Sequence, residues 1–306
     1  MVSIYPSLVQ SMFTGKMCVV TGGGSGIGRA LCEELAKAGA GGVYVVDIAR
    51  ESAQKVAASL PSLATNNYHQ LNNYFRCGFG VADVGNEDDV QRVIRDAWKL
   101  FGRIDVFFSN AGIMSMGGVD DVSNEQWEQI WNVNVMSHLF AARHLFPLWR
   151  LKKQSGSFTS NLENGENEDV SSEGVFVITA SAAGLLMQIG SLPYHVTKHA
   201  AVSVADWLAV HHHDDGVRVH CICPQAVQTN MLTSSTAPGG GSAGFDGILS
   251  PRDVAVETIQ AIGRGQFLVL PHPKVKKYFE RKASDYDRWL NGMRRVHRHF
   301  FSPTKL

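Results

Sequence analysis

Neither sign of charge dominates this sequence of 306 residues. Lysine and arginine together number 28, and so do aspartate and glutamate. A chain without net charge lacks the overall positive field that attracts nucleic acid, so we expect no nucleic-acid partner. Hydrophobic residues make up 44% of the chain and charged residues 18%, a balance that supports a substantial core and argues against global disorder.

Cysteines are few and odd in number, which argues against a disulfide framework. Three of the five, Cys18, Cys221 and Cys223, fall in apolar segments typical of strands, so we expect reduced thiols in a reducing compartment. The chain has no Cys-x-x-Cys pair, and the three histidines at 211–213 would point to different sides of a helix end. We therefore expect no metal site.

No apolar run is continuous enough to span a membrane, which takes about 20 residues. The segment 174–190 comes closest, but Thr179, Ser181 and Gln188 interrupt it. The first residues lack the charged-then-apolar order of a signal peptide, so we expect a cytoplasmic protein. The alternative is the peroxisome, because the final Thr304-Lys305-Leu306 resembles the Ser-Lys-Leu signal of that compartment.

Strand-like and helix-like segments alternate along most of the chain. Strands are predicted at 17–20, 43–46, 75–81, 102–109, 175–179, 217–223 and 267–270, and helices at 29–37, 50–60, 87–101, 124–150, 193–213 and 251–262. This alternation predicts an α/β fold, a doubly wound (Rossmann) parallel seven-stranded sheet with helices on both faces. In such folds ligands bind at the carboxyl ends of the strands.

Two segments depart from the alternation. Residues 151–173 are rich in Ser, Asn and Glu and predict a flexible surface insertion, not a domain linker. Residues 274–300 combine a helical stripe of apolar residues with a basic opposite face. We therefore divide the chain into a dinucleotide-binding and catalytic domain at 1–271 and a basic amphipathic helical extension at 272–306. The extension is predicted to pack on the body or on a neighbouring subunit, and a helix lying on a membrane surface is the alternative.

A glycine-rich turn, Thr21-Gly22-Gly23-Gly24-Ser25-Gly26-Ile27-Gly28, joins the first predicted strand to the first helix. Glycines here let a phosphate approach backbone N–H groups at the positive end of a helix. No Gly-Lys-Ser/Thr closes the turn, so it is not a Walker-type loop. Asp47 ends the second strand 25 positions after Gly22, near the ~20-residue spacing of a ribose-binding acid. Such an acid repels a 2′-phosphate and favours NAD over NADP; a surface acid that merely ends a strand is the alternative.

Tyr194 and Lys198 are four positions apart in a predicted helix and therefore share one face. A free tyrosine, with a pKa near ~10, is a poor base at neutral pH. An ammonium at roughly 4–5 Å supplies about the 3–4 kcal/mol needed to lower that pKa by ~2–3 units. Such a pair in a cleft can take a proton from an alcohol or return one to a carbonyl. A Tyr and a Lys at this spacing are common on amphipathic helices. A catalytic role for this pair therefore needs support from other motifs.

Further motifs resemble those of the short-chain dehydrogenase/reductase family, and the resemblance covers about residues 15–270. Besides the glycine turn, they are Asn110-Ala111-Gly112, Trp127 followed seven positions later by Asn134, and Ser181 placed 13 positions before Tyr194. The sequence departs from the family pattern at two places. Ser109 stands where the family usually has Asn, and Gln225 follows Pro224 where the family usually has glycine.

The resemblance implies a catalytic set of Asn134, Ser181, Tyr194 and Lys198. Tyr194 would be the general acid/base and Ser181 would orient the substrate oxygen. Lys198 would lower the pKa of Tyr194 and hold the nicotinamide ribose, and Asn134 would help to position a relay water. The implied cofactor is NAD, and the residues expected to bind it are Gly22, Ser25, Gly26, Ile27, Gly28, Asp47, Asp83, Val84, Asn110, Tyr194, Lys198, Val227 and Thr229.

The sequence thus predicts an NAD-dependent enzyme that oxidises a secondary alcohol to a ketone, reversibly. Nine apolar residues flank the expected cleft and predict an apolar, bulky substrate such as a lipid, steroid, terpenoid or aromatic compound: Met114, Met116, Leu185, Leu186, Met187, Ile189, Leu192, Met231 and Leu232. The resemblance also implies a homodimer or homotetramer, because members of the family commonly pack two long helices, here 124–150 and 194–213, against a partner subunit. Two alternatives remain, a non-catalytic NAD-binding regulatory or scaffold protein and a carbonyl reductase acting mainly in the reductive direction.

Overall fold

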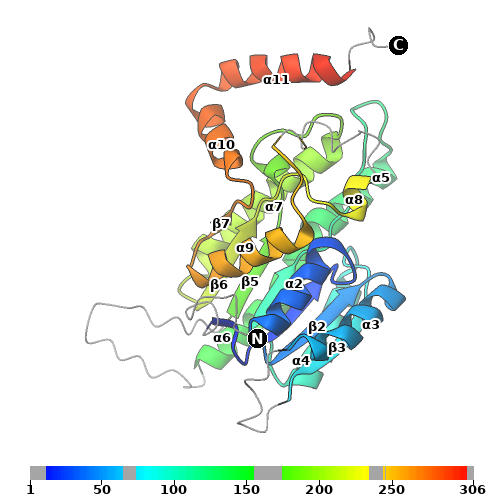
Figure 1. Cartoon of the computed structure of the whole chain (residues 1–306), viewed down its shortest axis with the longest axis vertical. Coiled ribbons are helices and arrows are strands. Elements are labelled where there is room, and N and C mark those ends of the chain that lie inside the picture. The colour runs from blue at the N-terminus through cyan, green and yellow to red at the C-terminus, as the bar shows by residue number, and fades with distance from the viewer. Residues whose placement is uncertain (1–11, 65–73, 155–173, 234–243, 245, 302–306) are drawn as a thin grey trace, which may run out of the picture.

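A computed structural model describes residues 12–64, 74–154, 174–233, 244 and 246–301. A sheet lies between two layers of helices, and helices α10 (Lys274–Ser284) and α11 (Tyr286–Phe301) extend from the body at one end (Figure 1). Within these described residues no helix is both long and apolar enough to cross a membrane. Residues 155–173 of the predicted insertion and the C-terminal Thr304-Lys305-Leu306 lie outside them, so the insertion and the compartment remain predictions.

The sheet is built from seven parallel strands. They are β1 (Met17–Thr21), β2 (Gly42–Asp47), β3 (Arg76–Val81), β4 (Val106–Ser109), β5 (Gly174–Thr179), β6 (Val217–Ile222) and β7 (Leu268–Val269). Their order is β3-β2-β1-β4-β5-β6-β7, so the direction of winding reverses between β1 and β4. The predicted doubly wound seven-stranded sheet is confirmed, and the reversal opens a crevice for a ligand at the carboxyl ends of β1 and β4.

The α-helices of the body whose bounds the structure describes lie on either side of the sheet. They are α2 (Gly26–Lys37), α3 (Arg50–Ser59), α4 (Glu87–Phe101), α5 (Asn124–Trp131), α6 (Ser137–Gln154), α7 (Leu192–His211), α8 (Asn230–Thr233) and α9 (Pro251–Gly263). The sequence sets several of their starts. The Asn86 side chain accepts a hydrogen bond from the main chain of Asp89, and Ser123 and Ser250 form capping boxes at α5 and α9.

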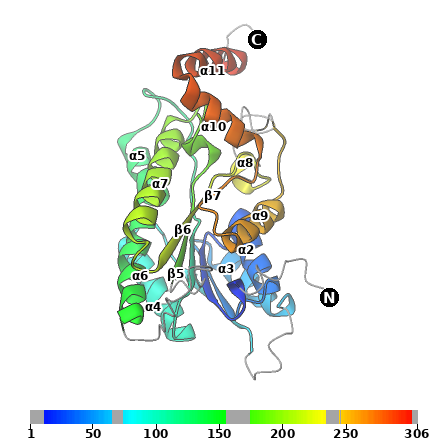
Figure 2. The same ribbon diagram turned by 90° about the vertical axis from the view of Figure 1, so that its left-hand side faces the viewer.

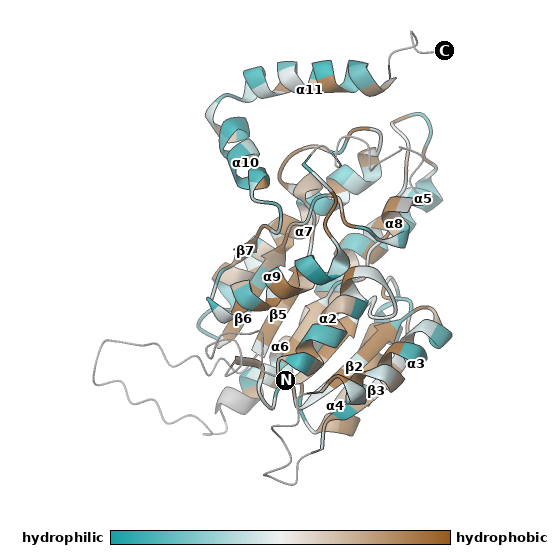
Figure 3. Cartoon of the chain, viewed as in Figure 1, coloured by the Kyte–Doolittle hydropathy of each residue, from teal (hydrophilic) through white to brown (hydrophobic). Residues whose placement is uncertain are grey.

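The two helix layers cover opposite faces of the sheet. Cys18 and Val20 of β1 pack in the core beneath α2, α3 and α9, whereas Val19 between them packs on the side of α4, α6 and α7. Figure 2 shows these layers on either side of the sheet. Burial on both faces explains why the strands read as continuous apolar runs, and they stand out as hydrophobic in Figure 3.

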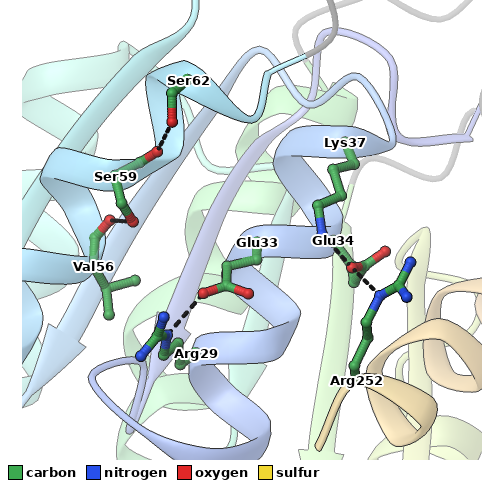
Figure 4. A network of polar contacts seen from close by, with 8 residues as sticks. All are labelled: Arg29, Glu33, Glu34, Lys37, Val56, Ser59, Ser62 and Arg252. Carbon is green, nitrogen blue, oxygen red and sulfur yellow. Dashed lines mark hydrogen bonds and ion pairs between the residues drawn. The ribbon is translucent and has the colours of Figure 1, made fainter. Parts of the chain in front are cut away.

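An ionic contact joins α2 to α9 beside the sheet (Figure 4). The side chain of Glu34 is only 1% exposed, and its Oε1 lies 2.6 Å from Nζ of Lys37 and 3.1 Å from Nε of Arg252. A buried carboxylate without such partners would be strongly destabilising, so these two cations are what permits Glu34 at this place. The contact fixes α9 against the helix whose first turn follows the glycine turn.

Three predicted elements differ from the structure. The strand predicted at 102–109 begins only at Val106, because Gly102 adopts a left-handed conformation (φ 80°) that ends α4. Residues 151–154 belong to α6 rather than to the insertion. The long helix predicted at 124–150 contains a π-helical turn, Asn132–Met136, between α5 and α6. Hydrophobic spacing cannot reveal this turn, because one extra residue barely disturbs the apolar stripe.

The C-terminal extension forms two helices where one was predicted. Asp285, between α10 and α11, has an extended backbone (φ −154°), and its Oδ1 accepts a hydrogen bond of 3.0 Å from the main-chain N of Arg288. Aspartate favours this capping conformation, so it ends one helix and starts the next. Val275 of α10 is completely buried in the core cluster of the α4, α6 and α7 side. The extension is therefore anchored on the body.

Candidate active site

A cavity of about 870 Å³ lies over the carboxyl ends of the strands. Residues that end or follow six different strands line it, among them Gly22 after β1, Asp47 at the end of β2, and Asn110 after β4. Every residue predicted to bind the cofactor lines this one cavity, as do Ser181, Tyr194 and Lys198. The structure thus brings together residues that are spread over more than 200 positions of the sequence.

The glycine turn passes against neighbouring main chain at distances that only glycine allows. Gly22 has a positive φ of 65°, and a Cβ built on Gly28 would lie 2.1 Å from the carbonyl oxygen of Gly22. The turn leads directly into α2, whose N-cap residue Ser25 makes no side-chain capping bond. The first N–H groups of α2 are therefore not satisfied by that side chain, and they suit a phosphate.

Asp47 is held against the glycine turn by main-chain groups. Its Oδ2 accepts a hydrogen bond of 2.9 Å from N of Gly24, and its Oδ1 accepts one of 3.0 Å from N of Ala49. The carboxylate is thereby oriented where the predicted adenosine ribose would lie. Asp83 and Val84, predicted to meet the adenine, line the cavity after β3, and Oδ1 of Asp83 accepts from N of Gly85 at 2.9 Å.

Asn110 joins the ends of three strands as well as lining the cavity. Its Nδ2 donates to the carbonyl oxygen of Thr21 at 2.9 Å, and its Oδ1 accepts from the Thr179 hydroxyl at 3.1 Å. The Thr21 hydroxyl in turn accepts hydrogen bonds from the main-chain N of Asn110 and of Ala111. These bonds tie the carboxyl ends of β1, β4 and β5 to one another beside the cavity.

Ser181, Tyr194 and Lys198 come together in the middle of the cavity, each less than a tenth exposed. The Ser181 hydroxyl lies 3.3 Å from the carbonyl oxygen of Pro224 and is also a hydrogen-bond partner of the Tyr194 phenol. Nζ of Lys198 donates to the carbonyl oxygen of Thr179 at 2.9 Å and lies 5.6 Å from the centre of the Tyr194 ring. Tyr194 thus has both a hydroxyl and an amine as neighbours.

Burial dominates the pKa values of both ionisable groups. It raises the pKa of the Tyr194 phenol above its usual value, although the hydrogen bond to Ser181 acts in the opposite direction. Burial also lowers the pKa of Lys198 to about 8. A lowering of the Tyr194 pKa by the Lys198 ammonium stays a prediction.

Asn134 lies behind the cavity wall rather than in it. Its Oδ1 accepts from N of Ile113 at 2.9 Å, and its Nδ2 donates to the carbonyl oxygen of Ile113 and to the hydroxyl of Thr197. It meets Lys198 across Gly112, where an added Cβ would lie 3.3 Å from both Oδ1 of Asn134 and Nζ of Lys198. All four residues of the predicted catalytic set are therefore neighbours, and the π-helical turn carries Asn134.

The segment after β6 forms the wall that faces the glycine turn. Val227 and Thr229 line the cavity, and a Cβ added to Gly26 would lie 3.0 Å from Cγ2 of Thr229. His272 fixes this segment: its Nδ1 accepts from N of Gln225 and its Nε2 donates to the carbonyl oxygen of Ala226, both at 3.1 Å. This pattern needs a neutral imidazole, and burial lowers the pKa of His272 accordingly. Nothing in the sequence marked His272, which is 47 positions from Gln225.

Seven of the nine apolar residues predicted at the cleft line the cavity, whereas Leu185 and Leu192 do not. Leu185 is buried in the core instead. The C-terminal extension contributes a wall that the sequence did not place residue by residue: Tyr278, Trp289, Met293, Val296 and Phe300, together with Asp246 from the preceding loop. The apolar stripe of the extension and its packing on the body were predicted from the sequence, but the side chains that line the cavity were not.

The fold and the site together define a nucleotide-binding oxidoreductase with a Rossmann-type sheet. A family model described as enoyl-(acyl carrier protein) reductase matches residues 22–244. Since this is more than half of the chain, the protein belongs to the short-chain dehydrogenase/reductase family. The predicted family is therefore confirmed, and with it an oxidoreductase acting on a CH–OH group.

Three comparisons illustrate the relationship. The chain is 32% identical to a 1-deoxy-11-beta-hydroxypentalenate dehydrogenase of Streptomyces exfoliatus over 82% of this chain and 81% of that protein. It is 31% identical to a meso-2,3-butanediol dehydrogenase of Serratia marcescens over 72% and 74% of the two chains. A short-chain dehydrogenase/reductase from Burkholderia phymatum, solved with NAD, is similar with a TM-score of 0.70 and 25% identity, covering 96% of this chain and 99% of that one.

Proposed function

We propose that the protein is an NAD-dependent dehydrogenase that oxidises a secondary alcohol of an apolar substrate to the ketone, reversibly. The observation that carries this proposal is the continuity of the cavity. It runs from Asp47 at the glycine turn, past Ser181 and Tyr194, to the apolar wall of the extension. A dinucleotide at one end and an alcohol at the other would thus meet beside Tyr194.

The proposed mechanism divides the work between the protein and the cofactor. When bound, nicotinamide supplies the chemistry of accepting a hydride from the carbinol carbon. Tyr194 takes the hydroxyl proton as general base, and Ser181 donates a hydrogen bond that orients the alcohol oxygen. Lys198 holds the nicotinamide ribose and, in its charged form, favours the phenolate of Tyr194. Asn134, next to Lys198 at Gly112, helps to hold a water through which the proton leaves.

Asp47 supports NAD over NADP. Its carboxylate is oriented by Gly24 and Ala49 and would accept hydrogen bonds from the adenosine ribose. The 2′-phosphate of NADP would be repelled at the same place. A preference for NAD favours the oxidative direction over that of an NADPH-dependent carbonyl reductase. The named relatives are dehydrogenases of hydroxy compounds, which supports the same direction.

The apolar side chains at the far end of the cavity support a bulky, largely apolar substrate. Met114, Leu186 and Met231 come from the body and Met293 and Val296 from α11. The extension thus contributes to substrate binding, and we assign residues 1–271 to the dinucleotide-binding and catalytic domain and 272–306 to this extension. The lipid, steroid, terpenoid and aromatic alcohols predicted from the sequence all fit the composition of this wall.

A panel of secondary alcohols, assayed by the appearance of NADH, tests the proposal. We expect turnover with bulky apolar alcohols, little with short ones, and none with the Tyr194→Phe variant. Calorimetry of NAD binding to the same proteins is the companion measurement. If both the wild type and the variant bind NAD but oxidise no alcohol, the protein is a non-catalytic NAD-binding regulatory or scaffold protein.

A further inference from the structure

Three polar atoms of residues that line the cavity are buried and have no hydrogen-bond partner among the described residues. They are Oε1 of Gln225, Oδ2 of Asp246 and Nε1 of Trp289. None of these residues belongs to the catalytic set or to the predicted cofactor contacts. Buried polar atoms in folded proteins are nearly always paired. Unpaired polar atoms around one cavity therefore point to polar ligand groups that pair with them.

Asp246 is firmly placed by the extension. Its Oδ1 accepts hydrogen bonds of 3.0 Å from the Tyr278 hydroxyl and from Nζ of Lys274, and its side chain is 6% exposed. Burial acts to raise the pKa of this carboxyl, but hydrogen bonds from Lys274, Tyr278 and Gln225 outweigh it and hold the pKa below its usual value. The carboxylate is therefore ionised near neutral pH, and Oδ2 is the oxygen left to accept a proton donor.

Gln225 adds an acceptor beside Asp246. Its main chain is fixed by His272, and its side-chain amide lies close enough to the Asp246 carboxylate to help lower the pKa of that group. The carbonyl Oε1 of the amide has no partner among the described residues and is left as an acceptor. A glycine at this position, as the family pattern has it, would bring no amide into the cavity. The side chain at 225 is thus a feature of this chain.

Two acceptors side by side require a neutral group that donates a hydrogen bond. A ketone or ether offers no proton, and a carboxylate would be repelled by Asp246. Lys274 already balances the charge of Asp246, so an ammonium is not needed for neutrality. A hydroxyl is neutral and can donate its single proton to either acceptor. We propose that Gln225 and Asp246 form a subsite for a second hydroxyl, away from the reacting carbinol, of an otherwise apolar substrate.

This inference rests on the proposed alcohol oxidation and names its preferred substrates as diols with an apolar body. The probes are androstanediol and androstanol, which share one skeleton and differ in the second hydroxyl. We expect kcat/KM of the wild type to favour the diol by at least about tenfold, since a buried site built for a hydroxyl rejects analogues without it. Gln225→Met, which keeps the side-chain length without the amide, should reduce that preference severalfold.

Gln228→Met is the matched control. Gln228 lies in the same segment but is exposed and does not line the cavity, so this variant should keep the diol preference. Asp246→Asn provides a second test, because it changes the acceptor without changing its size. Equal kcat/KM for both steroids, or an unchanged ratio in Gln225→Met and in Asp246→Asn, would overturn the subsite while leaving alcohol oxidation intact. Absence of NADH formation from either steroid and from the whole alcohol panel would instead overturn the proposed function.

Discussion

Lys282 of α10 donates a hydrogen bond of 2.8 Å to the main-chain oxygen of Leu185, four residues after Ser181. The same ammonium also reaches the main-chain oxygen of Leu186 at 3.0 Å. Together with the Lys274–Asp246 ion pair, this contact ties the extension to two walls of the cavity. The extension therefore shapes the substrate end of the cavity. It also contributes to the stability of the fold.

Removal of the extension should damage binding of bulky substrates most. Deleting residues 272–306 removes Val275 from the core and Trp289 and Met293 from the cavity wall. We expect a lower Tm, and a KM that rises more for bulky alcohols than for small ones. Lys282→Met is the milder test and should raise KM for bulky alcohols severalfold, with Lys276→Met on the exposed side as its control. If deletion leaves Tm and KM unchanged but abolishes binding to anionic vesicles, the extension is a membrane-surface helix.

Loss of the proposed acid/base group should separate binding from turnover. Tyr194→Phe keeps the ring beside Lys198 and removes only the phenolic hydroxyl. We expect turnover to fall at least about a hundredfold, the usual scale for such a group, while the Kd for NAD changes little. Stopped-flow measurement of NADH formation tests the expected loss of turnover, and calorimetry of NAD binding tests the expected Kd. Near-normal turnover in this variant would contradict the proposed mechanism.

The elements whose signals are local could be predicted from the sequence. Asn86 and Ser250 are capping residues that mark the starts of α4 and α9. The buried strands are continuous apolar runs because helices cover both faces of the sheet. The glycine turn and Asp47 were likewise visible, since a short segment carries the whole pattern. The wall formed by Trp289 was not predictable in detail, because it depends on a tertiary contact between two distant segments. His272 shows the same limit: its role exists only once β6 has brought Gln225 beside it.

Cofactor preference should depend on the single carboxylate of Asp47. Asp47→Ala removes both the ribose acceptor and the repulsion of a 2′-phosphate. We expect kcat/KM for NAD to fall and that for NADP to rise, so that the ratio between them narrows by at least about tenfold, or about 1.4 kcal/mol. Steady-state assays with both cofactors and one alcohol measure this ratio. A wild-type protein that already uses both cofactors equally would show that Asp47 does not select between them.

Lys198 should lower the stability of the fold near neutral pH. Its pKa is lowered to about 8 in the folded chain by burial, against about 10.4 in an unfolded one. The unfolded chain binds more protons between these two values, so this group's contribution to stability rises with pH across about pH 8 to 10. Lys198→Met should therefore be inactive yet up to about 3 kcal/mol more stable at pH 7, less the lost bond to Thr179. Urea unfolding at several pH values measures this difference, which should shrink as the pH rises; a variant that is less stable at every pH would contradict it.

Trp207 on α7 offers the clearest test of assembly. Trp207 is 54% exposed, and its indole ring stacks on the imidazole of His211 with ring centres 3.9 Å apart. Trp131 on the neighbouring α5 is 39% exposed, so two indoles face solvent on the helices where a partner subunit is predicted. Because burying large aromatic surfaces stabilises protein interfaces, we expect a dimer or tetramer of the 33.4 kDa chain. Trp207→Glu should shift light scattering toward the mass of the single chain. Val119→Glu, at a residue that is 81% exposed and belongs to neither helix, should not. A wild-type protein that stays at the mass of one chain at micromolar concentration would refute the predicted assembly, and the exposed indoles would then need another partner.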